Sequence, residues 1–549
     1  MKIKPVFVGI VIVGVLLLLL SLSTVAKVLS ATPRQVLTGV QNQPLAVNIL
    51  PKRSPLWISF LVKPEKLGLF AQLASPPSDR AEVRRDLATL KQQLRQNWLL
   101  DYERDIQPWL DQEIALAVTD LDLDAKPENG LQTGYLLAFT IKDAELAKSS
   151  IDAFWQRLAV DGADLNFEQY QGVPIISNSF VANQPAIAGT VLDKFVLFAN
   201  DPRVLHQAIA TLQSPETSVA NLDNYRDRLT SLDIGRNKGK VIVAYVNLAE
   251  FGADLPQESL LINFSFDKSG IRAKTALTLA NSDQNSPSSQ ASSSIKNLKN
   301  SFSNIANLIP SASSVLIGHN LDQTIQNLQA TLLPEWRQAI AQVLSPLDIA
   351  NNALAWVQDD YAIAFLPKTN NAPDWLIVTR AVDAQKVETA IADLDRSVRS
   401  KFTVGEISLK AQPVTVWTKL SASDNSGVSG NVVAAHSQTK DYLYLSNSLA
   451  VLESALNLKN NQAIATSTSF KNAIAKLPKN GQNYAYLDKN LDISLLQNSF
   501  FNLNNTSEIF GSISNLPLAL IHKHIKAIAL NDIDNSQNIQ SYEALLILK

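Results

Sequence analysis

The chain contains no cysteine, and this absence removes several kinds of chemistry at once. Without thiols there are no disulfides, no thiolate nucleophile, no cysteine-based metal site and no lipid attached through cysteine. Glycine is also scarce, at 19 of 549 residues, and no glycine-rich phosphate-binding loop is present. The net charge is only −2, and basic residues are not interleaved with aromatic ones in any patch. We therefore expect no nucleic-acid partner.

Histidine is rare as well, and its positions give no metal-binding pattern. The five histidines are His206, His319, His436, His522 and His524. None has the paired spacing of a zinc motif, and His522 with His524 would need a third ligand from elsewhere. We interpret that pair as exposed basic residues beside Lys523 and Lys526, and we expect no metal and no cofactor.

An alternating acidic run begins like a calcium-binding loop and then departs from it. Asp120, Asp122 and Asp124 match the first ligands of such a loop, but Ala125 replaces the turn glycine and Leu131 replaces the bidentate glutamate. A solvated hairpin loop is the favoured interpretation, with adventitious calcium binding as the alternative.

Serine chemistry has no better support. Ser293 and Lys296 satisfy a Ser-x-x-Lys pattern, but they lie in a serine-rich stretch that cannot hold a base rigidly. No Gly-x-Ser-x-Gly elbow occurs. Asn263 and Asn504 begin glycosylation-type triplets, which are weak signals. The sequence therefore predicts no catalytic residue.

The chain does carry an internal repeat. Trp109–Val118 (WLDQEIALAV) recurs as Trp356–Phe365 (WVQDDYAIAF), 247 positions later. Other matches follow in the same order, 240 to 247 positions apart: Tyr135–Ile141 with Trp375–Ala381, Phe195–Phe198 with Tyr442–Leu445, and Ala244–Tyr245 with Ala485–Tyr486. Such ordered matches predict two copies of one module of about 240 residues.

Apolar patterning predicts strands in hairpin order with helices inserted between them. In the first copy strands are expected at 56–62, 113–119, 135–141, 173–177, 187–191, 195–198, 241–246, 261–266 and 271–279. Helices are expected from about Asp143 to Leu158 and after Pro202. Because a clean βαβ alternation is absent, the fold class is predicted as α+β, with helices packed on mainly antiparallel sheet.

Composition divides the chain into five segments. These are an N-terminal transmembrane or signal-anchor segment (1–30), a tether (31–50), repeat module 1 (51–280), a Ser/Asn-rich linker (281–300) and repeat module 2 (301–549). Serine fills 7 of the 13 positions from 282 to 294, which is typical of a flexible linker.

The N-terminal segment is long and apolar. Pro5–Ala26 has no charge, and Val6–Leu20 is wholly apolar apart from two glycines, close to the length that spans a bilayer. The alternative is a cleaved signal peptide that begins with Lys2 and Lys4 and ends near Ala26. The length favours an uncleaved anchor. Either way the bulk is expected to be extracytoplasmic, in the periplasm or thylakoid lumen. With the anchor uncleaved, we expect a single-pass membrane protein.

The whole arrangement resembles an uncharacterised family of cyanobacterial membrane-anchored proteins, catalogued as a domain of unknown function. The resemblance is carried by Val6–Leu20, by the Trp109–Val118 and Trp356–Phe365 blocks, and by the helix starts at Asp143-Ala144 and Asp383-Ala384. It implies an anchored protein of the thylakoid or plasma membrane. It implies no activity, so no residue roles can be transferred.

Two acids occupy the same place in the two copies, as do two tryptophans. Glu113 matches Asp360, and Trp109 matches Trp356. A glycosidase needs two carboxylates across one cleft, and an indole would suit a sugar. The favoured interpretation is structural, with the indole covering the sheet edge and the acid facing water at a strand start.

Three functions remain after these exclusions. The leading hypothesis is a non-enzymatic, membrane-tethered interaction or scaffold protein with a protein partner, because the copies repeat apolar positions rather than polar ones. The alternative is a binding protein for a lipid, a pigment or another apolar ligand. A hydrolase ranks third, since it would need converging acidic, histidine or serine residues in one cleft.

Overall fold

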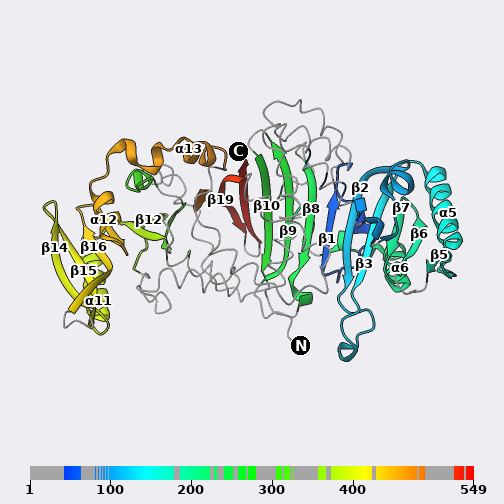
Figure 1. The fold of residues 1–549 in the computed structure, drawn as a ribbon, viewed down its shortest axis with the longest axis horizontal. Helices are drawn as coiled ribbons and strands as arrows, with labels where there is room; N and C mark the ends of the chain where they lie inside the picture. The colour runs from blue at the N-terminus through cyan, green and yellow to red at the C-terminus, as the bar shows by residue number, and fades with distance from the viewer. Residues whose placement is uncertain are drawn as a thin grey trace.

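The computed structural model describes an elongated protein built around one antiparallel sheet (Figure 1). The described residues are 43–63, 98–178, 186–222, 240–251, 257–267, 270–279, 304–311, 314–321, 356–366, 373–422, 428–478, 483–488, 525–536 and 539–548, with single positions within 81–96 and 225–232 and at 324 and 481. We call residues 43–279 the N-terminal half and residues 304–548 the C-terminal half.

Each half contributes ten strands within its described residues. The N-terminal half holds β1 (Leu56–Phe60), β2 (Leu110–Asp120), β3 (Gly134–Ile141), β4 (Leu165–Tyr170), β5 (Val173–Asn178), β6 (Ala188–Leu192), β7 (Phe195–Ala199), β8 (Lys240–Asn247), β9 (Gln257–Asp267) and β10 (Gly270–Leu279). The C-terminal half holds β11 (Ser314–His319), β12 (Asp360–Leu366), β13 (Asp374–Arg380), β14 (Thr403–Leu409), β15 (Gln412–Ala422), β16 (Val428–Gln438), β17 (Tyr442–Ser446), β18 (Tyr484–Asp488), β19 (Ile525–Ser536) and β20 (Ile539–Leu548).

Within the described residues the α-helices are fewer than the strands. The α-helices are α5 (Ala144–Val160), α6 (Pro202–Gln213), α11 (Ala384–Val398), α12 (Leu449–Leu456) and α13 (Thr468–Ile474). The short turns are η3 (Ala46–Asn48), the π-type η4 (Tyr102–Ile106), η5 (Pro127–Asn129), η6 (Pro215–Thr217), η7 (Val219–Asn221), η8 (Leu248–Phe251), η12 (Asn460–Gln462) and η13 (Ile464–Thr466).

The strand order is the same in the two halves. Neighbouring strands of the N-terminal half run β4-β5-β6-β7-β3-β2-β1-β8-β9-β10. Those of the C-terminal half run β14-β15-β16-β17-β13-β12-β11-β18-β19-β20. The two sets meet where β10 pairs with β20 in antiparallel register. The twenty strands therefore form a single sheet.

A buried ion cluster lies at this seam between the halves. Glu543 of β20, with its side chain 2% exposed, forms an ion pair with Arg272 of β10, and its Oε2 lies 3.9 Å from Nζ of Lys274. The guanidinium of Arg272 also donates to the carbonyl of Lys476 at 3.3 Å. Opposite charges on facing strands favour this register over others.

Helices cover both faces of the sheet toward its two ends (Figure 1). In the N-terminal half, Phe154 of α5 packs with Phe198 on one face, and Leu205 of α6 packs with Leu197 on the other. In the C-terminal half, α11 and α12 divide the faces in the same way. Because β7 is covered on both sides, all five of its residues are apolar and buried.

Aspartates cap the starts of three helices, and the starts at Asp143 and Asp383 lie where the sequence predicts them. Asp143 accepts from the backbone N–H of Leu146 at 3.0 Å, and Asp383 accepts from that of Lys386 at 3.1 Å. Asp201 caps α6, whose first residue is proline. The prediction of mainly antiparallel sheet with helices packed on it is confirmed.

Part of the expected tether belongs to the core. Ala46, Val47, Ile49 and Leu50 are at most 5% exposed and pack under α6 and η7. The carbonyl of Leu50 accepts from the backbone N–H of Val219 at 2.8 Å. The boundary expected at residue 51 therefore lies inside a packed segment, because the mainly apolar run 45–50 is buried with the core.

Two sequence-based expectations lie outside the described residues. One is the anchor at 1–30, and the other is the linker at 281–300. Among the helices within the described ranges, none combines the length and the apolar character that crossing a bilayer requires.

Candidate functional site

A pocket of about 310 Å³ opens in the C-terminal half at the start of α11. It lies between the segment that precedes β12, the end of β13 and the first turn of α11. Its lining combines charged residues with apolar walls: Trp356, Gln358, Asp359, Thr379, Arg380, Val382, Asp383, Lys386 and Val387.

Local contacts hold the rim of this pocket in place. Asp383 is occupied as the N-cap of α11. Nζ of Lys386 donates to Oε1 of Gln358 at 3.0 Å, which ties the helix to the segment before β12. Val387 is buried in the core beneath the pocket, while Val382 is 62% exposed at the rim. The pocket is therefore a fixed feature of the helix–sheet junction.

A cluster around Asp360 adjoins the pocket. Nδ1 of His319 lies 3.1 Å from Oδ1 of Asp360, and Nη1 of Arg380 lies 3.9 Å from Oδ2. Because β11, β12 and β13 are neighbours, these three side chains stand on one face of the sheet. The hydrogen bond to Asp360 raises the pKa of His319. Arg380 belongs to both this cluster and the pocket.

The equivalent helix–sheet junction of the N-terminal half is filled by buried side chains. Trp109 is fully buried there, and its Nε1 donates to the carbonyl of Asp105 at 2.7 Å. Phe139 meets Trp109 edge-on with centroids 6.0 Å apart. The carboxylate of Asp105 accepts from Arg157 at 2.9 Å, which links η4 to α5 beside the indole. The indole thus lies in the core rather than at an edge.

The acid at the matching position is buried rather than exposed. Glu113 is 1% exposed and accepts from the backbone N–H groups of Leu45 at 2.6 Å and Ala46 at 3.2 Å. Oγ of Ser59 donates to it at 2.8 Å. Desolvation raises the pKa of Glu113 despite these donors. The interpretation that this acid faces water is wrong, because residues 45–48 fold back over it.

Glu113 and Asp360 cannot form a pair of catalytic carboxylates. Eight strands separate β2 from β12 along the sheet, so the two acids lie roughly 40 Å apart at about 4.8 Å per strand. Glycosidase carboxylates lie within about 10 Å of each other. The two acids therefore do not share one active site.

Sequence comparison places the chain in a family. A profile described as "Protein of unknown function (DUF3352)" matches residues 10–548. The chain belongs to the DUF3352 family. The resemblance to an uncharacterised domain-of-unknown-function family is thus confirmed at this level. No curated protein matches the DUF3352 chain.

Solved structures show only a distant similarity to the DUF3352 chain. Crystal form III of TP0453 is 9% identical over 45% of this chain and 84% of that one, with a TM-score of 0.23. Crystal form I of TP0453 is 10% identical over 44% and 82%, with a TM-score of 0.24. Neither score supports an argument about function.

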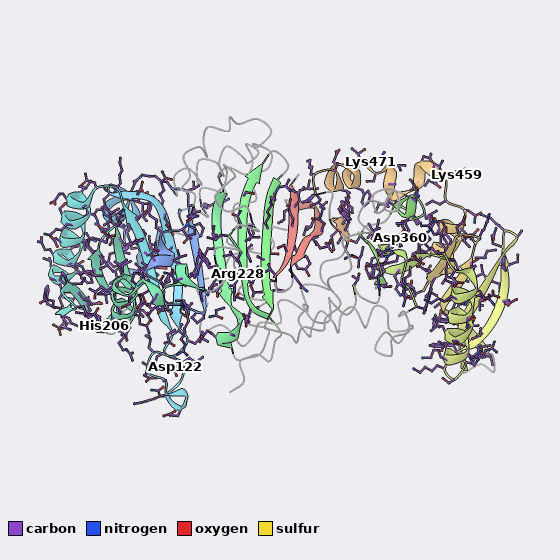
Figure 2. The ribbon with its side chains drawn as sticks, turned by 180° about the vertical axis from the view of Figure 1, so that it is seen from behind. Asp122, His206, Arg228, Asp360, Lys459 and Lys471 are labelled. Carbon is purple, nitrogen blue, oxygen red and sulfur yellow. The ribbon has the colours of Figure 1, made fainter. Side chains whose placement is uncertain are left out.

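The acidic run of the DUF3352 chain serves its own loop, which projects from the body at Asp122 (Figure 2). Asp120 accepts from the backbone N–H of Asp122 at 3.0 Å, and Asp122 from that of Gln132 at 3.2 Å. Asp124 accepts from Nδ2 of Asn129 at 2.8 Å, a bond that lowers its pKa. The acidic run thus lies in the loop of the β2–β3 hairpin. No group of three possible metal ligands is found among the described residues.

The described histidines are dispersed, with His206 near the opposite end of the molecule from Asp360 (Figure 2). The ring of His206 stacks on Tyr170 with centroids 4.1 Å apart. Nε2 of His436 donates to Asp395 at 2.9 Å. His522 and His524 lie outside the described residues, as do Ser293, Lys296 and Asn504.

For two further residues of the DUF3352 chain, the position in the structure differs from what the sequence signal suggested. Asn263 is 5% exposed within β9, so its glycosylation-type triplet is buried in the sheet. Arg380 carried no motif, because its partner Asp360 and the pocket walls come from separate segments. Sequence spacing gives no signal for such a site.

Proposed function

We propose that this DUF3352 protein is a membrane-anchored extracytoplasmic interaction or scaffold protein made of two copies of one module. The observation that carries the proposal is the continuous twenty-stranded sheet. At about 4.8 Å per strand it extends up to roughly 90 Å before twist is considered. Such a body presents binding surfaces at two distant ends that are held in a fixed relation.

Local details support the idea of two copies. Asp143 and Asp383 cap the first long helix of each half in the same way. The hairpins β4–β5 and β14–β15 both turn through two residues with left-handed backbone, Gln171–Gly172 and Lys410–Ala411. These matches accompany an identical strand order, which independent folds would not share.

The buried acids support a structural rather than catalytic use of polar groups. Glu113 binds backbone N–H groups, Asp105 pairs with Arg157, and Glu543 pairs with Arg272 across the seam. Each carboxylate is committed to holding elements together. On this ground we assign no reaction to the protein.

The N-terminal sequence supports the membrane tether. Val6–Leu20 is apolar apart from two glycines, and Leu45 is held to the body by a hydrogen bond from its backbone N–H to Glu113. The fourteen residues between positions 30 and 45 reach at most about 50 Å when fully extended. The body would therefore stay close to the bilayer, in the periplasm or thylakoid lumen of a cyanobacterial cell.

Membrane extraction tests the tether. We expect the full chain to resist carbonate extraction and a reporter fused after residue 549 to be active outside the cytoplasm. Replacing Leu16 and Leu18 by arginine should release the protein, because charges at the centre of an apolar span are costly. The control is Leu131→Arg, in a loop where that leucine is 46% exposed. Release of the unchanged chain, or a cytoplasmic reporter, contradicts the proposal.

Crosslinking tests the interaction role. The exposed apolar residues Phe167 of β4 (71%) and Val428 of β16 (75%) lie toward opposite ends of the sheet. A photoreactive residue at either place, in the full chain in native membranes, should capture a reproducible partner. Phe167→Asp and Val428→Asp should reduce recovery of that partner, while Lys148→Asp serves as control. The absence of any reproducible partner from both ends contradicts the scaffold role.

A further inference from the structure

We infer that the pocket at the start of α11 binds a small organic oxyanion, a carboxylate or phosphate ester with an apolar body. The scaffold function does not require such a ligand, so this site goes beyond it. The inference rests on the two cations, on the apolar walls and on the contrast with the N-terminal half.

Arg380 is the group that would hold the oxyanion. Its side chain is 52% exposed and lies 3.9 Å from Asp360, a long contact that occupies little of the guanidinium. A guanidinium carries five N–H donors in a fork that matches carboxylate and phosphate oxygens. Arg380 therefore has donors available toward the pocket that it lines.

Lys386 supplies a second positive charge. Its Nζ is fixed by Oε1 of Gln358 at 3.0 Å, which is a neutral partner and leaves the ammonium charge uncompensated there. Asp383 also lines the pocket, but its carboxylate is used by the backbone N–H of Lys386. Asp359 is the remaining acid of the lining, and it favours a ligand with a hydroxyl or amine donor beside the oxyanion.

The apolar walls indicate a ligand with a body as well as a charge. Trp356 and Val387 form part of the lining, and Val382 is 62% exposed at its rim. A volume of about 310 Å³ lies at the small end of ligand pockets, which are roughly 300–1,000 Å³. An inorganic anion bound at the two cations would leave these apolar walls in contact with water, whereas a ligand with an apolar body would cover them.

The equivalent place in the N-terminal half carries neither of these two cations. Counted from the helix caps, Arg380 stands where the N-terminal half has Thr140, and Lys386 stands where it has Leu146. Phe139 fills the place that Thr379 leaves open. One half therefore packs this junction with apolar side chains, while the other lines an open volume with two cations and two acids, of which Asp383 caps α11.

Calorimetry on the full chain in detergent at low ionic strength tests the inference. The probes are phenyl phosphate and phenylacetate, with inorganic phosphate and phenol as the charge-only and ring-only probes. We expect at least one of the two aryl anions to bind tenfold or more tightly than either of the partial probes. The pair of aryl anions distinguishes a phosphate site from a carboxylate site.

Variants place the binding in this pocket. Arg380→Gln and Lys386→Gln should each weaken aryl-anion binding about tenfold, and Asp359→Asn should tighten it severalfold by removing repulsion. The control is Arg396→Gln, on an exposed arginine of the same helix that pairs with Asp393. Circular dichroism monitors folding. If Arg380→Gln does not fold, the other two variants test the inference, because Lys386→Gln should weaken aryl-anion binding and Asp359→Asn should tighten it.

Three outcomes overturn the inference. They are no aryl-anion binding at millimolar concentration, equal binding of phenol, or equal loss of affinity in Arg396→Gln. Because the scaffold role is tested by crosslinking at the ends of the sheet, failure here leaves that result independent.

Discussion

Nε2 of His436 on β16 donates a 2.9 Å hydrogen bond to Asp395 on α11, in the place where the N-terminal half sets Trp155 against Gly189. Trp155 and Asp395 both lie twelve residues after the aspartate that caps their helix. One junction is filled by a large helix residue over a strand glycine. The other is filled by a short helix residue and a large strand residue.

Hydrogen bonds make the second arrangement stable. Asp395 also accepts from Nε1 of Trp417 at 2.7 Å. Although burial opposes ionisation, the bond from His436 holds the pKa of Asp395 below its ordinary value. The volume is thus conserved while the chemistry changes from apolar packing to a buried polar pair.

Overpacking at Gly189 should destabilise the protein. A Cβ at this position would stand 2.9 Å from Trp155 and 3.0 Å from Phe198. Gly189→Ala should therefore lower the free energy of unfolding by about 1–3 kcal/mol in urea titrations. Gly405→Ala, where a Cβ meets nothing within 4 Å, is the matched control. Equal effects at the two glycines would show that the contact with Trp155 relaxes freely.

Removing the Glu113 carboxylate should loosen the packed segment at residues 45–48. Glu113→Ala leaves the N–H groups of Leu45 and Ala46 buried without an acceptor, at a cost of about 1–3 kcal/mol. Hydrogen exchange at those two amides should rise together with the loss of stability. Asp111→Ala on the same strand is the control, and unchanged exchange at Leu45 contradicts the contact.

The two hairpin turns predict opposite effects of glycine and alanine. Ala411 has a φ of +69° and Gly172 a φ of +82° at the second position of matching turns. Ala411→Gly should stabilise the protein and Gly172→Ala should destabilise it, each by about 0.5–1 kcal/mol, because left-handed backbone strains any Cβ. A Cβ at Gly172 meets nothing within 4 Å, so the effect is conformational. Thermal midpoints that move in the same direction contradict this account.

The His319–Asp360 pair predicts a pH dependence. Because the folded-state pKa of His319 is raised above 6.5 by Asp360, its contribution to stability is complete below that pH. It is lost as the pH rises through the folded-state pKa. The wild-type advantage over His319→Asn should therefore be larger at pH 6 than at pH 8.5 in thermal unfolding. An advantage that grows with pH contradicts the assigned charge state, and Asp360→Asn should abolish the dependence.

In the N-terminal half, sequence reasoning found a strand that is buried on both faces and missed one at the sheet edge. Phe195–Ala199 is apolar throughout and was predicted as a strand, because burial on both faces leaves a continuous apolar run. Strand β4 (Leu165–Tyr170) was missed, because it lies at the sheet edge and exposes Asn166, Glu168 and Gln169 at least in part. Edge strands carry few apolar residues, so periodicity gives little signal there.

The polar contacts could not be predicted from the sequence, for a different reason. His319 and Asp360 are 41 residues apart and meet only because β11 pairs with β12. Glu113 is buried only because residues 45–48 return across β2, 67 residues away in the chain. Such contacts depend on topology, and no local spacing encodes them. The pocket beside α11 depends in the same way on three separate segments.

Because β10 pairs with β20, the sheet cannot be completed until the last strand of the chain has been synthesised. Roughly 260 residues separate the end of β10 from the start of β20, so a nascent N-terminal half is finished long before its neighbour strand exists. During that interval β10 exposes unpaired backbone groups that can capture the edge strand of another molecule. Translocation and chaperone timing would then govern yield, and a ribosome stalled after β10 would release a species prone to cross-molecule strand exchange.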